Sequence, residues 1–320
     1  MPINEQPAGQ VASDHAFVDP SKVAKLAISL VRGDLIHAAT MNRDFQAEFG
    51  GGSGSTVDVE VPAVLGPARE RELHATTSIV MDTLTSSVLP VVIDTHVYSA
   101  VRIDDADMTL NIADFGRQVL QPQTIAMVEN LENRAVALMK TAPAYHATDF
   151  PLIPEWVADE PLDTFTAARK YLRDMRLPAA GLFAACGTEV YADLLNMGAL
   201  TDVSQAGSSD ALRNAVAGKV RGFLTYESNR LGEKEVIFYN RASFTLAIRA
   251  PKVPKGAAYG HSAAANGFAL RWLADYDADT LADRSIVSTF VGGRSIPVQG
   301  IGKDGQATGL TVPALKIVKP

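Results

Sequence analysis

The sequence predicts an α+β protein, and three patterns carry that prediction. Leu89 to Ile103 is rich in β-branched residues and alternates in part, which predicts a strand buried on one face. Pro122 to Ala142 has apolar residues at helical spacing and predicts one long helix that Pro143 ends. From Val236 onward, short strands dominate. Helices and strands thus occur in separate runs, unlike the repeating βαβ order of a nucleotide-binding sheet.

Composition bounds the class of protein. The 320 residues, 47% of them hydrophobic, suffice for one large domain or two intertwined ones. The net charge is −7 and no basic block occurs, which argues against a direct DNA reader. The single cysteine, Cys186, excludes an internal disulfide, and its apolar neighbours predict a buried thiol rather than a nucleophile. Without a membrane-length apolar run or a signal-peptide pattern, we expect a reducing, aqueous compartment.

The N-terminal third predicts an arm, a helix and a hairpin. Residues 1–19 are polar and predict an extended arm, and Ser21 can cap a helix that begins at Lys22. Val57–Val61 alternates and predicts a strand that pairs with the later one across a long hairpin, with its tip near residues 66–88. Between the helix and the hairpin, four glycines give the backbone freedom of a hinge: Gly50, Gly51, Gly52 and Gly54.

The long helix has a narrow apolar stripe and is roughly 30 Å long at 1.5 Å per residue. Asp114 is placed to cap a short turn before it. The stripe comprises Thr124, Met127, Val128, Leu131, Ala135, Leu138 and Met139. The residues predicted to lie outside it are Glu129, Glu132, Arg134 and Lys140.

The rest of the chain predicts an α/β module and then a strand-rich return. Pro151, Pro154 and Pro161 mark the change of module. The predicted helices are Leu162–Met175, Glu189–Met197 and Ser209–Val216. The predicted strands are Gly181–Cys186, Gly218–Tyr226, Val236–Tyr239, Phe244–Ile248, Phe268–Tyr276, Ser285–Phe290 and Thr311–Val318.

One motif suggests hydrolase chemistry. Gly260-His-Ser-Ala-Ala264 resembles a nucleophile elbow with Ser262 as the nucleophile. The elbow of such hydrolases is followed in the chain by an acid and then a histidine, whereas all six histidines precede Ser262. A triad built from an upstream histidine stays geometrically open. Because no nucleophile, base and oxyanion hole assemble from the motifs, we expect no enzyme.

Other motifs predict neither a metal nor a cofactor. Asp275-Tyr-Asp-Ala-Asp279 begins like a calcium loop, but Thr280 and Ile286 stand where that loop needs glycine and glutamate, so a polar turn is favoured over ion binding. The glycine tract lacks the lysine of a phosphate-binding loop. The charged run Arg69, Glu70, Arg71 and Glu72 fits a solvated turn or an ion-pair patch between subunits, and both interpretations stay open.

Several segments resemble the major capsid proteins of tailed double-stranded-DNA phages, especially the coat proteins of actinobacterial phages. Together they cover most of residues 20–230 in one consistent order. The segments are Asp44–Gly50 with Gly54–Pro62, Leu89–Val101, Leu110–Gln123, and Gly218–Asn229 with its Gly-Phe-x-x-x-x-Ser-Asn turn.

This resemblance implies the Hong Kong 97-type coat fold. The implied function is a structural one: pentamers and hexamers that close an icosahedral shell around double-stranded DNA, without sequence-specific DNA binding and without a membrane. The implied partners are other copies of the chain, a portal and a decoration protein. The implied regions are an N-terminal arm (1–49), an extended hairpin loop (50–103), a peripheral domain with the long helix as its spine (104–150 and 250–300) and an axial domain (151–249 and 301–320).

Two departures from relatives refine the expectation. No lysine occurs between Lys25 and Lys140, so the hairpin cannot be welded to a neighbour through a lysine and the shell should be non-covalent. Only a short segment precedes the first predicted helix, which implies a separate scaffolding protein. Alternatives are an encapsulin-type nanocompartment shell, a tail or connector protein, and a serine hydrolase at Ser262.

Overall fold

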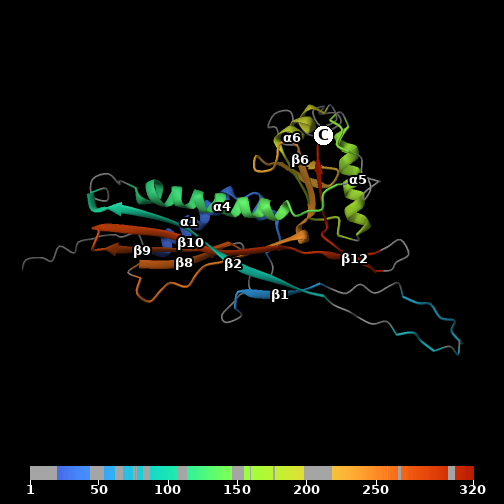
Figure 1. Cartoon of the computed structure of the whole chain (residues 1–320), viewed down its shortest axis with the longest axis horizontal. Helices are drawn as coiled ribbons and strands as arrows, with labels where there is room; N and C mark the ends of the chain where they lie inside the picture. The colour runs from blue at the N-terminus through green and yellow to red at the C-terminus, as the bar shows by residue number, and fades with distance from the viewer. Residues whose placement is uncertain are drawn as a thin grey trace, which may run out of the picture.

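The protein is elongated, with a long sheet at one end and a compact α/β unit at the other (Figure 1). The computed structural model describes residues 20–43, 54–61, 68–74, 76, 78–81, 87–106, 114–145, 155–158, 160–175, 177–197, 218–257, 259–265, 268–301 and 307–320. Both helices and sheets are present in two bodies, so the predicted α+β fold is confirmed.

A six-stranded antiparallel sheet forms the long body. Its strand order is β1-β2-β10-β9-β8, and β7 pairs with β10 beyond the end of the β9 pairing. The strands are β1 (Thr56–Val61), β2 (Ser87–Asp104), β7 (Phe244–Arg249), β8 (Tyr259–Ala265), β9 (Phe268–Asp277) and β10 (Ala282–Ser295). The predicted pairing of the two hairpin strands is confirmed, with Val59 opposite Leu89.

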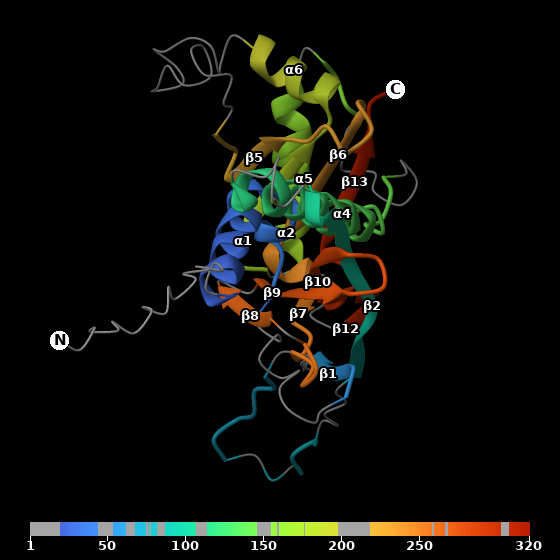
Figure 2. The same cartoon turned by 90° about the vertical axis from the view of Figure 1, so that its left-hand side faces the viewer.

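Helices cover one face of this sheet (Figures 1 and 2). They are α1 (Pro20–Asp34), α2 (His37–Thr40), the π-helical turn η2 (Gly116–Leu120) and the long helix α4 (Gln121–Met139). The predicted stripe of α4 is buried or half-buried and packs with Trp272 and Val287 of the sheet in one apolar core. Gln123 fastens α4 to the sheet, because its amide donates to Ser99 O at 3.1 Å and to Ser285 O at 2.8 Å.

Three details of the N-terminal half differ from the sequence prediction. The first helix begins at Pro20 rather than Lys22, and α4 ends at Met139, short of Ala142. Glu132 was predicted to lie outside the stripe, but it is 2% exposed. Position 132 follows Val128 by four residues and precedes Ala135 by three, so it lies on the buried face, where Glu132 meets polar partners instead of water. The predicted cap by Asp114 is confirmed, since its Oδ1 accepts from Arg117 N at 3.2 Å.

The compact unit is built on a second, five-stranded sheet of order β13-β6-β3-β5-β4. Its elements are α5 (Pro161–Asp174), β3 (Leu182–Cys186), α6 (Thr188–Asn196), β4 (Lys219–Val220), β5 (Phe223–Glu227), β6 (Glu235–Asn240) and β13 (Ala314–Val318). A separate core fills this unit, where Phe165 contacts Phe223 and Phe238 edge-on at centroid distances of 5.9 and 4.8 Å. Cys186 is fully buried in it, as predicted.

Strand boundaries in the C-terminal half also need correction. The strand predicted over Gly218–Tyr226 is divided into β4 and β5 by a tight turn at Arg221 and Gly222, which both have positive φ. The strand predicted over Thr311–Val318 is two, because β12 (Ala307–Thr311) pairs with β11 (Val298–Ile301) and β13 starts afresh. Strand β8 was not predicted. The helix predicted over 209–216 and residues 1–19 and 50–52 lie outside the described residues.

Candidate assembly surfaces

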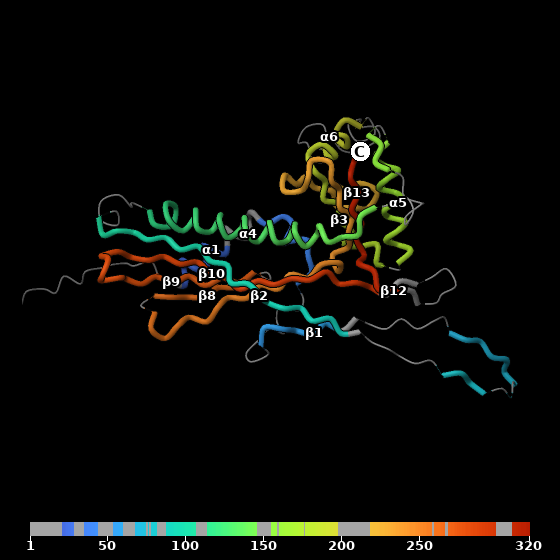
Figure 3. The backbone as a smooth tube through the Cα atoms, viewed as in Figure 1, coloured from blue at the N-terminus to red at the C-terminus, as the bar shows by residue number. Residues whose placement is uncertain are grey.

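The β1–β2 hairpin carries residues far from both bodies. We call the paired strands β1 and β2 from Ser87 to Val92 the β1–β2 ribbon. In Figure 3 the segment between the two strands extends beyond the end of this ribbon, away from the sheets and from α4. Residues 68–74 and 78–81 have no regular strand or helix, and every described side chain there is exposed. Four of them are large and apolar, with exposed fractions of 93% for Leu73, 71% for Ile79, 67% for Val80 and 82% for Met81. Such side chains at the end of a projecting hairpin are typical of a surface that another molecule covers.

The charged run predicted as a candidate contact lies in this same segment. Arg69, Glu70, Arg71 and Glu72 are all exposed and lie directly before Leu73. Of the candidate hinge glycines, Gly54 lies two residues before β1 with φ +75°, a conformation that favours glycine. Among the described residues outside its chain neighbours, no atom lies within 4 Å of where its Cβ would be. Gly50, Gly51 and Gly52 lie outside the described residues.

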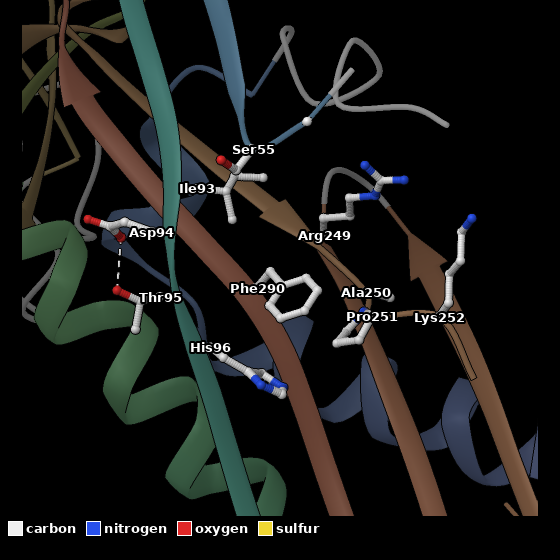
Figure 4. A pocket seen from close by; sticks show the side chains of 11 residues that line it. Ser55, Ile93, Asp94, Thr95, His96, Arg249, Ala250, Pro251, Lys252 and Phe290 are labelled. Atoms are coloured by element: carbon white, nitrogen blue, oxygen red, sulfur yellow. Dashed lines mark hydrogen bonds between the residues drawn. The ribbon is translucent and has the colours of Figure 1, made fainter. Parts of the chain in front are cut away.

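An open hollow of ≈ 550 Å³ lies where the ribbon joins the sheet. Figure 4 shows its lining: Ser55 comes from the base of the ribbon, and His96 and Phe290 from β2 and β10. Arg249 is the last residue of β7, and Lys252 follows that strand. The His96 ring lies 4.7 Å from the Phe290 ring, centroid to centroid. Partial burial, with Arg271 nearby, lowers the pKa of His96. The hollow is therefore apolar inside, with arginine and lysine at one edge.

A buried polar cluster joins α2, α4 and the turn after β5. His37 Nδ1 lies 2.5 Å from Glu132 Oε2, and His37 Nε2 lies 2.8 Å from Ser228 Oγ. Glu132 also accepts the backbone N–H groups of Ile36, His37 and Ala38 at 2.9–3.1 Å, so it caps the short helix α2 from a different element. Burial alone would raise the pKa of Glu132, but the hydrogen bonds from the His37 side chain and backbone and from Ala38 outweigh it and lower that pKa.

Glu132, His37 and Ser228 are hydrogen-bonded in the same series as the acid, histidine and serine of a hydrolase triad. The cluster is nevertheless closed to substrate. His37, Glu132 and Ser228 are each 2–3% exposed, so no external carbonyl reaches the hydroxyl. Ser228 Oγ also accepts the N–H groups of Arg230 and Leu231, both at 3.3 Å. With Nδ1–H donating to Glu132, Nε2 accepts the Ser228 hydroxyl, and every group has a partner. We interpret the cluster as a brace between elements.

Ser262 lacks the surroundings of a nucleophile. It lies within strand β8, not at a strand-to-helix turn, and its Oγ donates to Pro251 O at 3.0 Å. His261 precedes it directly in the strand, so the two side chains point to opposite faces of the sheet. Ser262 is thus not presented by the strand-to-helix turn that the nucleophile of such a hydrolase needs.

The aspartates at the end of β9 form ion pairs with Arg284. Asp275 Oδ2 lies 2.7 Å from Arg284 Nη2, and Asp277 Oδ2 lies 3.8 Å from Arg284 Nη1. Among the described residues, no three His, Cys, Asp or Glu side chains are placed to hold a metal ion. Burial raises the pKa of the Cys186 thiol, which suits a core residue and not a nucleophile. No helix in the described ranges is long and apolar enough to cross a membrane.

Comparison with known proteins finds its matches among solved structures. No family model matches the chain, and neither does any curated protein. A chain of Mycobacterium phage Che8 is similar with a TM-score of 0.61 and 16% identity, over 89% of this chain and 91% of that one. A chain from the capsid structure of the cyanophage P-SCSP1u has a TM-score of 0.53 and 13% identity, over 84% of each chain. A chain of a virus-like particle from Pyrococcus furiosus has a TM-score of 0.52 and 11% identity, over 93% of this chain and 98% of that one.

At these identities the likeness is one of fold. It extends over nearly the whole chain and includes both the long sheet with its helix and the compact unit. The chain therefore has the fold of phage capsid subunits, which is the Hong Kong 97-type fold that the resemblance of its sequence segments implied.

Proposed function

We propose that this protein is a major capsid protein, a structural subunit that assembles with copies of itself into an icosahedral shell around double-stranded DNA. The observation that carries the proposal is the fold, shared over 84% of the chain with a subunit of a cyanophage capsid. The sequence segments that resemble actinobacterial phage coat proteins support it independently. In this role the chain is a building element of the virion and acts without catalysis, a cofactor or a metal.

The shape of the subunit suits self-assembly. A projecting hairpin with exposed apolar residues at its end gains stability only when a neighbouring surface covers them. In a closed symmetric shell, many modest contacts of this kind add to a stable particle. We propose that Arg69, Glu70, Arg71 and Glu72 contribute ion pairs to a neighbouring subunit, and that Gly50, Gly51, Gly52 and Gly54 form the hinge of the hairpin.

We propose the division into regions that the resemblance implies. The hairpin is residues 50–103. The α4 body and its return strands form the peripheral domain, and the compact unit with β13 forms the axial domain. The second apolar core supports the axial domain as a unit, because its side chains come from the compact unit. The first core joins the long sheet and its helices to one face of the compact sheet, through Ala185, Ile237 and Tyr239. The negative net charge fits a wall that holds DNA without binding its sequence.

The partners proposed with this function are a separate scaffolding protein, a portal and a decoration protein. Pentamers and hexamers would assemble in the host cytoplasm and the finished shell would belong to the virion. Each of these partners is testable by co-expression with the genes that neighbour this one.

Negative-stain electron microscopy of the purified protein, alone and co-expressed with neighbouring genes, tests the function. Closed icosahedral shells tens of nanometres across are expected. Rings or tubes would point to a connector or tail protein. Monomers or dimers under every condition would remove the capsid proposal.

An encapsulin-type compartment shell is the second candidate, favoured by the likeness to the Pyrococcus furiosus virus-like particle over 98% of that chain. Both candidates predict closed particles, so the contents distinguish them. Nuclease-protected double-stranded DNA inside particles from infected cells is expected for a capsid. Particles that contain an enzyme and no genome would favour the compartment.

A further inference from the structure

The β1–β2 ribbon leaves the long sheet at one point, and Gly292 lies there. Strand β2 pairs with β10 from Asp104 down to Ile93, opposite Gly292, and then with β1 from Val92 to Ser87. Beyond Gly292, β10 continues beside β7 and no longer beside β2. The two backbones thus separate at Gly292 as at a fork. One branch leads to the hairpin and the other toward the compact unit.

The missing side chain of Gly292 lets the two backbones meet. A Cβ at this position would lie 1.9 Å from Val92 O and 2.7 Å from Ile93 Cα, and these are backbone atoms that cannot rotate away. The register also shifts here, because Val291 pairs with Thr95 while Gly292 pairs with Ile93, so Asp94 is left over as a bulge. A bulge bends its strand, and the bend begins where the ribbon turns away from the sheet.

Other contacts hold the base of the ribbon from one side. Arg294 Nη1 donates to Pro90 O at 2.8 Å, two residues beyond the fork. Val57, Val59 and Val91 of the ribbon form a small apolar cluster with Ala247 of β7. Elsewhere at the base, Gly54 and Ser55 border the hollow in Figure 4. The ribbon therefore has packed contacts in one place and open space in another, so a displaced ribbon has room to move.

We propose that Gly292 is the positioning residue of the hairpin: its close backbone contact with Val92 and Ile93 fixes the angle at which the ribbon leaves the sheet. The effect of this angle on particle assembly rests on the proposed capsid function, whereas the role of Gly292 in setting the angle does not. From Val92 to Ser87 the ribbon spans ~17 Å at about 3.4 Å per residue. A rotation of about 10° at the fork moves that far end by ~3 Å and the loop beyond it by more. Side-chain contacts need heavy atoms within ~4.5 Å, so this displacement suffices to separate them.

Spin-label distances in the unassembled subunit test the angle directly. One protein carries spin labels at Val88→Cys on the ribbon and Asp279→Cys on the long body, and a second carries them at Val88→Cys and Lys255→Cys. All three positions are exposed. Cys186 is fully buried and is not replaced. Labelling of a protein without added cysteines shows how much label Cys186 takes up. Gly292→Ala is expected to shift at least one distance by ~2 Å, the displacement that a rotation of about 10° gives at Val88. Gly309→Ala, where a Cβ meets no atom of the described residues within 4 Å, is the matched control and is expected to shift neither distance.

A second variant keeps the proposal testable if Gly292→Ala fails to fold. Arg294→Ala leaves the glycine and removes the hydrogen bond to Pro90, so both mean distances are expected to stay as in wild type, because the close contact at Gly292 fixes the angle. Unchanged distances in folded Gly292→Ala, or shifted mean distances in Arg294→Ala when it is the only one that folds, overturn the proposal.

Electron microscopy separates this inference from the proposed function. Wild-type and Gly309→Ala subunits are expected to form the same particles, whereas Gly292→Ala is expected to give particles of altered diameter or none. If the wild type forms no particles, the capsid function fails while the distances still decide the role of Gly292. If a Gly292→Ala subunit with a shifted ribbon forms particles of wild-type diameter, the inferred effect of the ribbon angle on assembly is overturned.

Discussion

Glu132 is a buried carboxylate whose partners come from another part of the chain. It accepts three backbone N–H groups at the start of α2 and the Nδ1 group of His37. Glu132→Gln replaces one acceptor oxygen by an NH2 group that faces those donors. We expect the free energy of unfolding to fall by roughly 2–4 kcal/mol, because buried donors lose their acceptor.

Urea denaturation of the unassembled subunit measures this loss. Glu129→Gln is the matched control, since Glu129 lies on the same helix with a side chain 63% exposed and only a 4.0 Å contact to Arg230. Its expected effect is within about 0.5 kcal/mol. Equal losses for the two variants would contradict the role given to Glu132.

The stabilisation by Glu132 also predicts a pH dependence. The pKa of Glu132 is lower in the folded protein than the ordinary value of about 4.3 in the unfolded chain. A lowered folded-state pKa means that the stabilising contribution is complete above the unfolded value and is lost as the pH falls through the folded one. We expect the difference in unfolding free energy between wild type and Glu132→Gln to be constant near neutral pH and to shrink below about pH 4. A difference that grows in acid would have the wrong sign.

The sequence could not reveal this brace, for a physical reason. Glu132 lies 95 residues from His37 in the chain, and 191 residues separate His37 from Ser228. Helical spacing places position 132 on the buried face, but the charge of glutamate argued for solvent. Only the tertiary structure shows that α2 supplies enough donors to offset burial of the carboxylate. The exposure of Arg69 to Glu72 was foreseeable, because charged side chains are rarely buried.

Among the elements, the turn between β3 and α6 depends on Gly187. A Cβ there would lie 2.0 Å from Gly232 O and 2.5 Å from Glu233 O, both backbone atoms. Gly187→Ala must push apart the turn that ends β5 and the start of α6, so we expect a loss of about 2 kcal/mol or more in unfolding free energy. Gly256→Ala, where a Cβ meets no atom of the described part of the chain within 4 Å, is expected to change the unfolding free energy by less than about 0.5 kcal/mol. Thermal and urea denaturation of both variants would decide the point.

Regular elements with strong periodicity were predictable, and turns set by tertiary contacts were not. Strand β2 and helix α4 follow from alternation and from helical spacing over many residues. The break between β4 and β5 escaped prediction because Arg221 takes a positive φ of 46°, which side-chain chemistry gives no reason to expect. Arg169 Nη1 donates to Arg221 O at 2.7 Å and holds that turn from helix α5. The division of β2 between two partner strands likewise needs the fold.

For the whole molecule, the end of the hairpin is where we expect assembly to be most sensitive. Ile79→Ser/Val80→Ser/Met81→Ser removes apolar surface that the isolated subunit already exposes, so its unfolding free energy should stay within about 0.5 kcal/mol of wild type. If a neighbour covers these side chains, each is worth about 1.5–3 kcal/mol there. The concentration needed for assembly should then rise at least about tenfold.

Light scattering against subunit concentration measures that threshold. The conservative triple variant Ile79→Val/Val80→Ile/Met81→Leu keeps the apolar surface at the same positions and is expected to assemble like wild type. An unchanged threshold in the serine variant would place the inter-subunit contact elsewhere on the chain.

The hairpin also lacks the chemistry for a covalent shell. No lysine lies between Lys25 and Lys140, so the hairpin has no amine to form an amide bond with a neighbour, and the only thiol, Cys186, is buried in the compact unit. Particles boiled in detergent should therefore run as a single band near 34.1 kDa, with or without reductant. A ladder of multiples that persists in reductant would show a cross-link from another part of the chain. A single band means that shell stability rests on many weak contacts, whose strength depends on how accurately each hairpin is aimed at its neighbour.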